Sequence, residues 1–183
     1  MTTKEILSNA TEKMEKAISS LKKEFANVRT GRANPAMLDL IKVDYYGFPT
    51  PLKEIAQILI PEPRQILIKP YEPESTKDVA KAIRDSNLGL APVIDEGSVR
   101  LNIPQLSEER RKEFVKLLGK LSENAKVSIR NVRRNANETI KKDKSMGEDR
   151  QRSLENDVQK STDNFIKKID DASKAKEKEI MTI

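Results

Sequence analysis

The sequence predicts an α+β protein of two domains, in which a small β/α/β domain is inserted into an elongated antiparallel three-helix bundle. All nine prolines of the 183 residues lie between Pro35 and Pro104, and proline breaks helix interiors. The segments on either side repeat apolar residues at the three- and four-residue spacing of amphipathic helices. The bundle is therefore predicted from residues 1–30 and 105–183, and the inserted domain from residues 31–104.

The first segment predicts one helix with a single apolar face. The residues on that face are Leu7, Ala10, Met14, Ala17, Leu21, Phe25 and Val28. Gly31 follows, and glycine often ends a helix because it adopts the left-handed conformation without strain. We expect the helix to stop at Gly31, with Arg29 and Arg32 exposed beside it and able to extend a basic surface to this junction.

The middle segment predicts strands joined by proline-rich turns, and one short helix. Three apolar, β-rich runs occupy residues 40–46, 56–60 and 65–70, and the turns between them read GFPTP and PEPR. The helix is expected to begin at Ser75 or Thr76, to end near Gly89, and to bury Val79, Ala82 and Ile83. A hairpin follows over residues 93–103, with its turn at Glu96 and Gly97.

Three aromatic residues, Tyr45, Tyr46 and Phe48, cluster at the end of the first of these runs. We interpret them as core packing beside a proline turn. Exposed aromatic side chains at this place would instead suit a partner surface.

The last segment predicts two long helices joined by a tight turn. The first is expected from about residue 107 to residue 144, capped by Ser107, with a length of roughly 55 Å. Its apolar row is Phe114, Leu118, Leu121, Ala125, Ile129, Val132, Ala136 and Ile140. Residues 144–147 mark the turn, and the apolar row of the second helix is Leu154, Val158, Phe165, Ile169 and Ala172.

The composition argues against an enzyme. The chain contains no cysteine and no histidine, which excludes disulfides, histidine-assisted nucleophiles and metal sites that need thiolate or imidazole. No glycine-rich phosphate loop occurs, and the acid pairs Asp95–Glu96 and Asp170–Asp171 are expected to be solvated. We expect no catalytic residue, no metal and no cofactor; an enzyme with an unrecognised carboxylate site is the least favoured alternative.

The amino-terminal residues MTTKEILSNATEK lack the uninterrupted apolar region of a secretory leader. No later segment is apolar over the length of a membrane span. Together with the absence of cysteine, this favours a cytoplasmic location and no membrane partner.

The positive charge is concentrated on the predicted helices. Residues 31–104 carry 9 Lys and Arg against 10 Asp and Glu, whereas the two flanks together carry 26 against 19, so the flanks hold the excess behind the net charge of +6. One stripe of the 107–144 helix, about 100° from its apolar row, carries Arg130, Arg134, Asn137 and Lys141. Arg133 falls between the two stripes, and no acid lies on the basic stripe between Lys126 and Lys144.

This stripe favours nucleic acid as the ligand. Arginine outnumbers lysine on it, and the planar guanidinium suits phosphate and base contacts better than an ammonium group does. The chain has no zinc-finger spacing, no short helix-turn-helix and no basic leucine zipper, so DNA is not expected and structured RNA is the better target. The alternative, from a different class, is a basic helical adaptor that binds an acidic protein partner.

Four blocks in this order resemble the ribosome recycling factor family: RTGRANPAMLD, YYGFPTPL, LGLAPVIDEGSVRLNIPQLSEERRKE and IRNVRRNAN. The similarity extends over essentially the whole chain, and departures are confined mainly to the DKSMGEDRQR connection between the last helices. The resemblance implies an L-shaped protein that imitates the outline of transfer RNA.

The resemblance also implies partners and sites. Members act on the post-termination ribosome with elongation factor G, whose GTP hydrolysis accompanies separation of the subunits. We expect this chain to be a monomer. Their bundle contacts ribosomal RNA of the large subunit across the acceptor and peptidyl sites. On matching positions the leading RNA contact is Arg133, supported by Arg130, Arg134, Arg29 and Arg32. The interdomain hinge corresponds to Gly31, Arg32, Asn102, Pro104 and Gln105.

Overall fold

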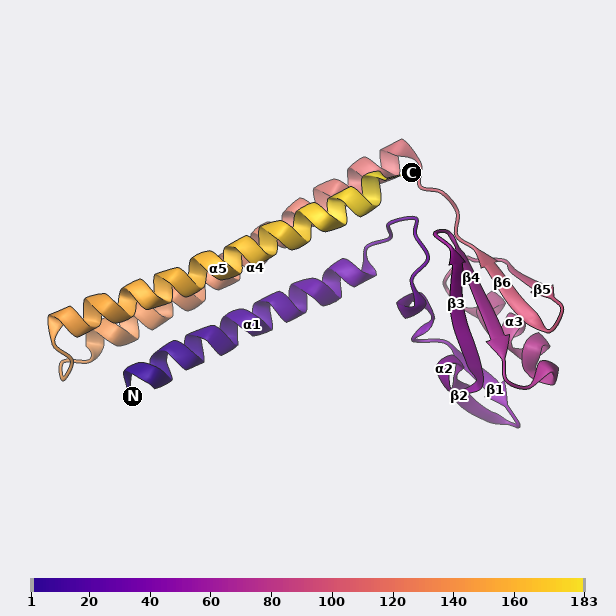
Figure 1. Cartoon of the computed structure of the whole chain (residues 1–183), viewed down its shortest axis with the longest axis horizontal. Helices are drawn as coiled ribbons and strands as arrows, with labels where there is room; N and C mark the ends of the chain where they lie inside the picture. The colour runs from indigo at the N-terminus through magenta and orange to yellow at the C-terminus, as the bar shows by residue number, and fades with distance from the viewer. Residues whose placement is uncertain (1, 183) are drawn as a thin grey trace. The chain divides into compact units, whose positions relative to one another are not determined.

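The computed structural model describes residues 2–182 and divides the chain into two compact units (Figure 1). Met1–Arg29 and Glu108–Ile183 form the helical unit, and Thr30–Ser107 forms the small unit. Each unit has hydrophobic clusters of its own. None of the helices within residues 2–182 has the length and hydropathy needed to cross a lipid bilayer.

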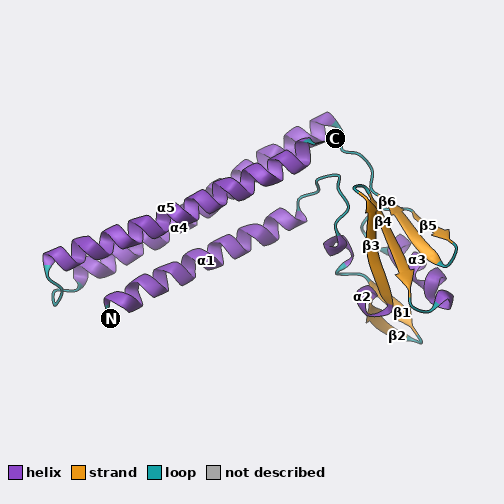
Figure 2. Ribbon diagram, viewed as in Figure 1, coloured by secondary structure: helices purple, strands orange, loops and turns teal. Residues whose placement is uncertain are grey.

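Three long helices lie side by side in the helical unit: α1 (Thr3–Asn27), α4 (Glu108–Lys142) and α5 (Glu148–Met181) (Figure 2). The tight connection between α4 and α5 makes these two helices antiparallel. Helix α1 is also antiparallel to α4, because Ile6 shares a core cluster with Ile140 near one end, and Phe25 shares one with Leu118 near the other. The predicted three-helix bundle is confirmed.

The core of the helical unit is formed by the apolar rows that the sequence pattern predicts. Its fully buried members include Met14 from α1, Ile129 and Ile140 from α4, and Val158 from α5. One buried position in α5 is polar: the Thr162 hydroxyl donates to the Val158 carbonyl oxygen at 2.8 Å. This bond satisfies the hydroxyl within its own helix, so a threonine can replace an apolar residue in the row.

The first helix begins and ends in ways that the sequence reading did not predict. At its start, Thr2 and Glu5 form a reciprocal capping box, with the Thr2 amide donating to Glu5 Oε2 at 2.8 Å. At its end, the prediction of a stop at Gly31 is wrong, because α1 finishes at Asn27 and Val28 is already extended. The Val28 side chain is buried and its amide donates to the Phe25 carbonyl oxygen at 3.1 Å, and Gly31, at φ +76°, lies in the connection beyond it.

The small unit contains two antiparallel sheets. Strands β1 (Lys42–Tyr45) and β2 (Phe48–Pro51) form a hairpin. A second sheet has the order β3-β4-β6-β5, from Ala56–Glu62, Gln65–Pro70, Ser98–Asn102 and Pro92–Asp95. The helical elements are the 3-10 turns η1 (Pro35–Leu38) and η2 (Pro73–Ser75) and the α-helices α2 (Leu52–Ile55) and α3 (Thr76–Asp85). The core includes Val43, Ile68, Val79, Ile83 and Val99, all fully buried.

The prediction of a turn at the GFPTP segment is wrong. The GFPTP segment, interpreted as a turn, is mostly strand, and Phe48 pairs with Tyr45 across a two-residue turn at Tyr46 and Gly47. Proline is tolerated there because β2 is an edge strand, which has a side that needs no ladder donor. The following short helix α2 was also not predicted.

Helix α3 and the last hairpin agree better with the sequence pattern. Ser75 occupies the N-cap position of α3 as expected, although its side chain makes no capping hydrogen bond. The helix stops at Asp85, four residues before the predicted end near Gly89. The turn at Glu96 and Gly97 is confirmed, since both residues have positive φ as a tight two-residue hairpin requires.

Candidate nucleic-acid interface

The predicted basic stripe lies on the outer side of α4. Arg130, Arg134 and Lys141 are exposed, and Asn137 is half-buried. The apolar row of the same helix, about 100° away, carries buried Ala125, Ile129, Ala136 and Ile140, which pack in the core. Core packing therefore fixes the rotation of α4 and turns the cationic side chains outward.

Arg133 lies at the edge of the core and is held by a neutral partner. Its Nη1 donates to Gln159 Oε1 on α5 at 3.2 Å, and the Gln159 amide nitrogen donates to Asp163 Oδ1 at 2.8 Å. Within residues 2–182 no carboxylate forms an ion pair with Arg133. The amide orients the guanidinium without cancelling its charge.

Arg130 is already bound to a carboxylate. Its Nη1 lies 2.9 Å from Glu123 Oε1, and the two side chains are 45% and 57% exposed. Glu123 is seven residues before Arg130, so it lies on the same stripe, just outside the interval that the sequence showed to be free of acid. An exposed pair of this kind contributes only about 0.2–1 kcal/mol, so a phosphate can displace Glu123 at little cost.

Two further polar residues on or beside the stripe are not available to a ligand. Lys126 forms an ion pair with Asp170 of α5 at 2.6 Å, which ties its charge to the bundle. Asn137 Oδ1 is buried and accepts no hydrogen bond within the described residues, so this oxygen is not available to a ligand. The free cations of the stripe are therefore Arg134 and Lys141, for which no ion pair occurs among residues 2–182.

The two arginines near the first connection belong to different units. Arg29 is exposed at the end of the helical unit, and Arg32 is exposed in the small unit. The sequence grouped them with the α4 stripe, but only Arg29 shares a compact unit with it.

The predicted hinge residues lie where the small unit holds both connecting segments. The Ala33 amide donates to the Pro63 carbonyl oxygen at 2.7 Å, and the Ile103 amide donates to the Arg64 carbonyl oxygen at 2.8 Å. Asn102 also accepts a hydrogen bond from Gln65 Nε2 at 3.2 Å. The β3–β4 turn thus anchors both segments, a role that the sequence did not reveal because PEPR read only as a turn.

The remaining hinge residues lie outside these anchors. Gly31 has φ +76°, and a Cβ atom there would lie 3.5 Å from Leu106 Cγ. Pro104 and Gln105 are exposed and follow the anchored Ile103. Any bending of the connections is therefore expected before Ala33 and after Ile103.

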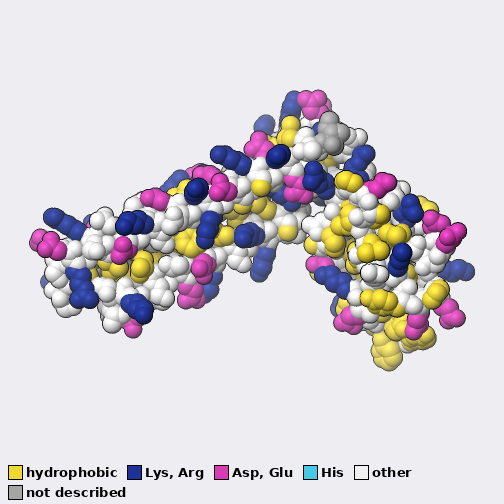
Figure 3. Space-filling view, in the orientation of Figure 1, with side chains coloured by type: hydrophobic (Ala, Val, Ile, Leu, Met, Phe, Trp, Pro, Cys, Tyr) yellow, Lys and Arg dark blue, Asp and Glu magenta, His cyan; other side chains and the backbone are white. Residues whose placement is uncertain are grey.

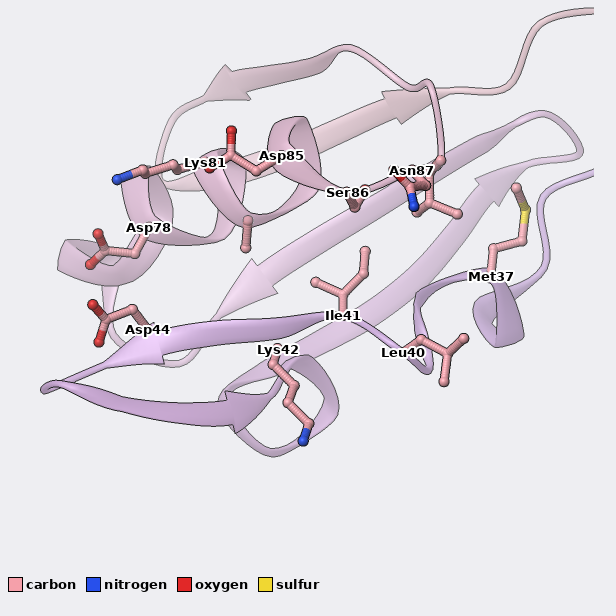
Figure 4. A pocket seen from close by; sticks show the side chains of 12 residues that line it. Met37, Leu40, Ile41, Lys42, Asp44, Asp78, Lys81, Asp85, Ser86 and Asn87 are labelled. Carbon is pink, nitrogen blue, oxygen red and sulfur yellow. The ribbon is translucent and has the colours of Figure 1, made fainter.

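An open groove of about 650 Å³ lies between α3 and the segment that leads into β1 (Figure 4). Its floor includes Ile41 and Ala82, and the acids on its rim, Asp44, Asp78 and Asp85, are all exposed. No group of three or more acidic, histidine or cysteine side chains able to hold a metal ion occurs within residues 2–182. Exposed acids at the mouth of an open groove lack the burial that shifts a carboxyl group toward acid–base work.

Comparison with known proteins gives a consistent match along the chain. Residues 21–181 match the family model described as ribosome recycling factor. The ribosome-recycling factor of Bacillus pumilus (strain SAFR-032) is 50% identical over 183 residues, which cover 98% of this chain and 99% of the relative. That of Bacillus subtilis (strain 168) is 49% identical with the same coverage of both chains.

Two solved structures agree with this match. A solution structure of the ribosome recycling factor has a TM-score of 0.80 at 39% identity, covering 100% of this chain and 99% of that chain. The second describes T. thermophilus ribosome recycling factor and E. coli elongation factor G bound to the E. coli post-termination complex. It has a TM-score of 0.67 at 40% identity and covers both chains completely.

Proposed function

The chain belongs to the ribosome recycling factor family, and on this premise we propose that it splits the post-termination ribosome into subunits together with elongation factor G and GTP. In this proposal the helical unit binds ribosomal RNA of the large subunit across the acceptor and peptidyl sites. The related factor described with elongation factor G on a post-termination complex supports the choice of partners.

The observation that carries the RNA contact is the arrangement around Arg133. Its guanidinium is aimed by the Gln159 amide and keeps its charge, while Arg134 and Lys141 on the same helix are exposed without ion pairs among residues 2–182. A planar guanidinium held in one orientation suits a phosphate, because less side-chain entropy is lost on binding. Arg130 joins them once Glu123 is displaced, and Arg29 is a further candidate at the end of the unit.

The proposed division of labour needs no catalytic group. The helical unit anchors the protein on RNA, and elongation factor G acts on the small unit through a hinge at Gly31, Arg32, Pro104 and Gln105. Asn102, also predicted as a hinge residue, lies beside it and is held by the hydrogen bond from Gln65. Binding energy and the partner's GTP cycle supply the work. We propose that the protein acts as a cytoplasmic monomer, without a cofactor, DNA or a membrane.

Light scattering tests this function directly. Purified protein, elongation factor G and GTP are mixed with post-termination ribosomes, and a fall in scattering reports separation into subunits. Arg133→Ala is expected to weaken sedimentation with large subunits roughly tenfold or more, since it removes a charged hydrogen-bond donor, with unchanged helical circular dichroism. Lys174→Ala, which removes an exposed cation from α5, is the matched control. Splitting that proceeds equally without the protein would exclude the proposal.

The alternative, a basic adaptor for an acidic protein, has one observation in its favour. Arg130 already binds a carboxylate of its own chain, which shows that an acidic side chain fits this stripe. Nuclease treatment of ribosomes before the sedimentation assay separates the two functions. Retention that survives the loss of RNA favours the adaptor, and loss of retention favours the RNA contact.

A further inference from the structure

Two exposed aromatic rings lie at the tip of the β1–β2 hairpin, and a third, Tyr71, directly precedes Glu72 in the chain. Tyr46 and Phe48 at the tip of the β1–β2 hairpin are each 73% exposed, and Tyr71 is 67% exposed. Figure 3 shows hydrophobic side chains gathered over this hairpin. The expectation that this cluster is core packing is therefore wrong for Tyr46 and Phe48, and only Tyr45 is partly buried.

The hairpin tip is held in one conformation. Tyr46 has φ +51°, a conformation that costs free energy for an aromatic residue, and Gly47 follows with φ +83°. The Tyr45 and Tyr46 hydroxyls donate to the two oxygens of Glu72, each at 2.7 Å. The two rings pack edge to face with centroids 4.6 Å apart. Glu72 thus fixes the tip, while the Tyr46 and Phe48 side chains remain exposed.

Acidic residues surround these rings. Glu74 lies close enough to Tyr46 to raise the pKa of its phenol, after the larger effect of the hydrogen bond to Glu72. The Thr76 hydroxyl, at the start of α3, donates to the Gly97 carbonyl oxygen at 3.3 Å. This contact holds the β5–β6 turn, with exposed Asp95 and Glu96, against the segment that follows Glu72 and Glu74.

The cations of these segments do not balance the acids. Arg100 is engaged by Asp95 at 3.4 Å, and the exposed cations are Lys69 on β4 and Lys77 and Lys81 on α3. The exposed acids Glu72, Glu74, Asp78 and Glu96 lie on the same segments or their connections. Together with Asp44 on β1, the acids of this surface outnumber its cations. The field therefore repels phosphate and attracts cations.

From this combination we infer that the hairpin tip is a docking surface for a lysine- or arginine-rich segment of a protein partner. The surface is defined by Tyr46, Phe48, Tyr71, Glu72 and Glu74. The faces of Tyr46 and Phe48 bind the guanidinium or ammonium groups, and the neighbouring carboxylates pair with the charges at the rim. Single-stranded RNA, which also stacks on aromatic rings, is disfavoured by the acids. The inference concerns the small unit and does not depend on the RNA contact of α4.

The three tyrosines of the chain provide the measurement. Tyr45, Tyr46 and Tyr71 are the only tyrosines; the first two are hydrogen-bonded to Glu72, and Tyr71 precedes Glu72 in the chain. In the full-length protein with ¹³C-labelled tyrosine, NMR follows these ring signals during titration with a decapeptide of alternating arginine and glycine. The matched probes are the same peptide with glutamate in place of arginine, and a uridine decanucleotide. We expect saturable shifts with the arginine peptide alone.

Substitutions identify the surface. Phe48→Ala is expected to raise the Kd for the arginine peptide roughly two- to fivefold, the scale of one exposed cation–π contact. Glu72→Gln removes a charge and is expected to raise it further. Leu40→Ala, which truncates a side chain 95% exposed and outside the surface, should leave the Kd unchanged. Equal shifts with the RNA probe, no shifts with the arginine peptide, or equal Kd values for all variants would each overturn the inference.

Discussion

Arg130 and Arg133 are three residues apart on α4, yet they differ in what holds them. Arg130 is paired with the Glu123 carboxylate, whereas Arg133 is bonded to the neutral Gln159 amide. A phosphate must displace Glu123 to reach Arg130, but it can bind Arg133 while the Gln159 contact remains. Under the proposed function, Arg133 is therefore the stronger RNA contact in the native chain.

Removing the competing acid should strengthen RNA binding. Glu123→Gln eliminates the ion pair with Arg130 and makes the stripe one charge more positive, so the affinity for large ribosomal subunits is expected to rise up to about fivefold. Quantitative sedimentation at fixed salt measures this change. Glu113→Gln, which removes an acid paired with Arg110 away from the stripe, is the control. An affinity that falls in Glu123→Gln would show that the pair positions Arg130 productively.

The tyrosine pair gives a prediction for pH. The hydrogen bond to Glu72 raises the pKa of Tyr45 to about 12, and that of Tyr46 is raised by the same carboxylate. Because the folded state retains these protons to higher pH than the unfolded chain, their contribution to stability is complete below pH about 10 and is lost as pH rises through 12.

Ultraviolet absorbance of ionised tyrosine, or the NMR ring signals, checks this titration. In Glu72→Gln the pKa of Tyr45 is expected to move back toward its ordinary value, because the charged acceptor is gone. Glu62→Gln, which removes an exposed acid at the end of β3, should not change it. A Tyr45 pKa near 10 in the native protein would rule out the bond to Glu72.

At the scale of elements, one side of α4 stabilises the fold by packing in the core, and its exposed side is the one proposed to bind RNA. Ile129 is fully buried, whereas Val127, two residues away, is 44% exposed. Ile129→Ala is expected to lower the free energy of unfolding by about 2–5 kcal/mol, from lost burial and the cavity left behind. Val127→Ala should change it by no more than about 0.5 kcal/mol. Urea unfolding followed by helical circular dichroism compares them, and equal midpoints would contradict the assignment of the two sides.

Features of the helices and strands that depend on neighbouring residues could be predicted from the sequence, whereas features that depend on distant contacts could not. The long helices and the turn at Glu96 and Gly97 follow from local periodicity and turn residues. The end of α1 does not, because the chain becomes extended at Val28, three residues before the glycine at which local rules end the helix. Strand β2 was missed because its prolines suggest a turn unless its position at a sheet edge is known.

At the scale of the whole molecule, the unequal distribution of charge predicts a salt dependence. The excess of Lys and Arg over Asp and Glu lies in the helical flanks, where they number 26 against 19. If several phosphates are bound, the logarithm of the affinity should fall with the logarithm of salt concentration by about one unit per contact, by analogy with duplex DNA.

A salt series with large ribosomal subunits tests this dependence. Lys141→Ala should reduce the slope by about one, and Lys174→Ala should leave it unchanged. A flat series for the native protein would exclude an electrostatic anchor.

The sequence by itself determined which segments form the three long helices, which side of each is buried, and that Arg130, Arg134 and Lys141 share the outer side of α4. These features depend on residues three or four apart in the sequence, because the regular turn of a helix places such residues on the same face. Tertiary structure alone decided that Gln159, 26 residues from Arg133, orients its guanidinium, and that Glu72 joins two tyrosines 26 and 27 residues away. Such contacts depend on how elements pack, because a side-chain hydrogen bond acts over about 3 Å whatever the separation along the chain.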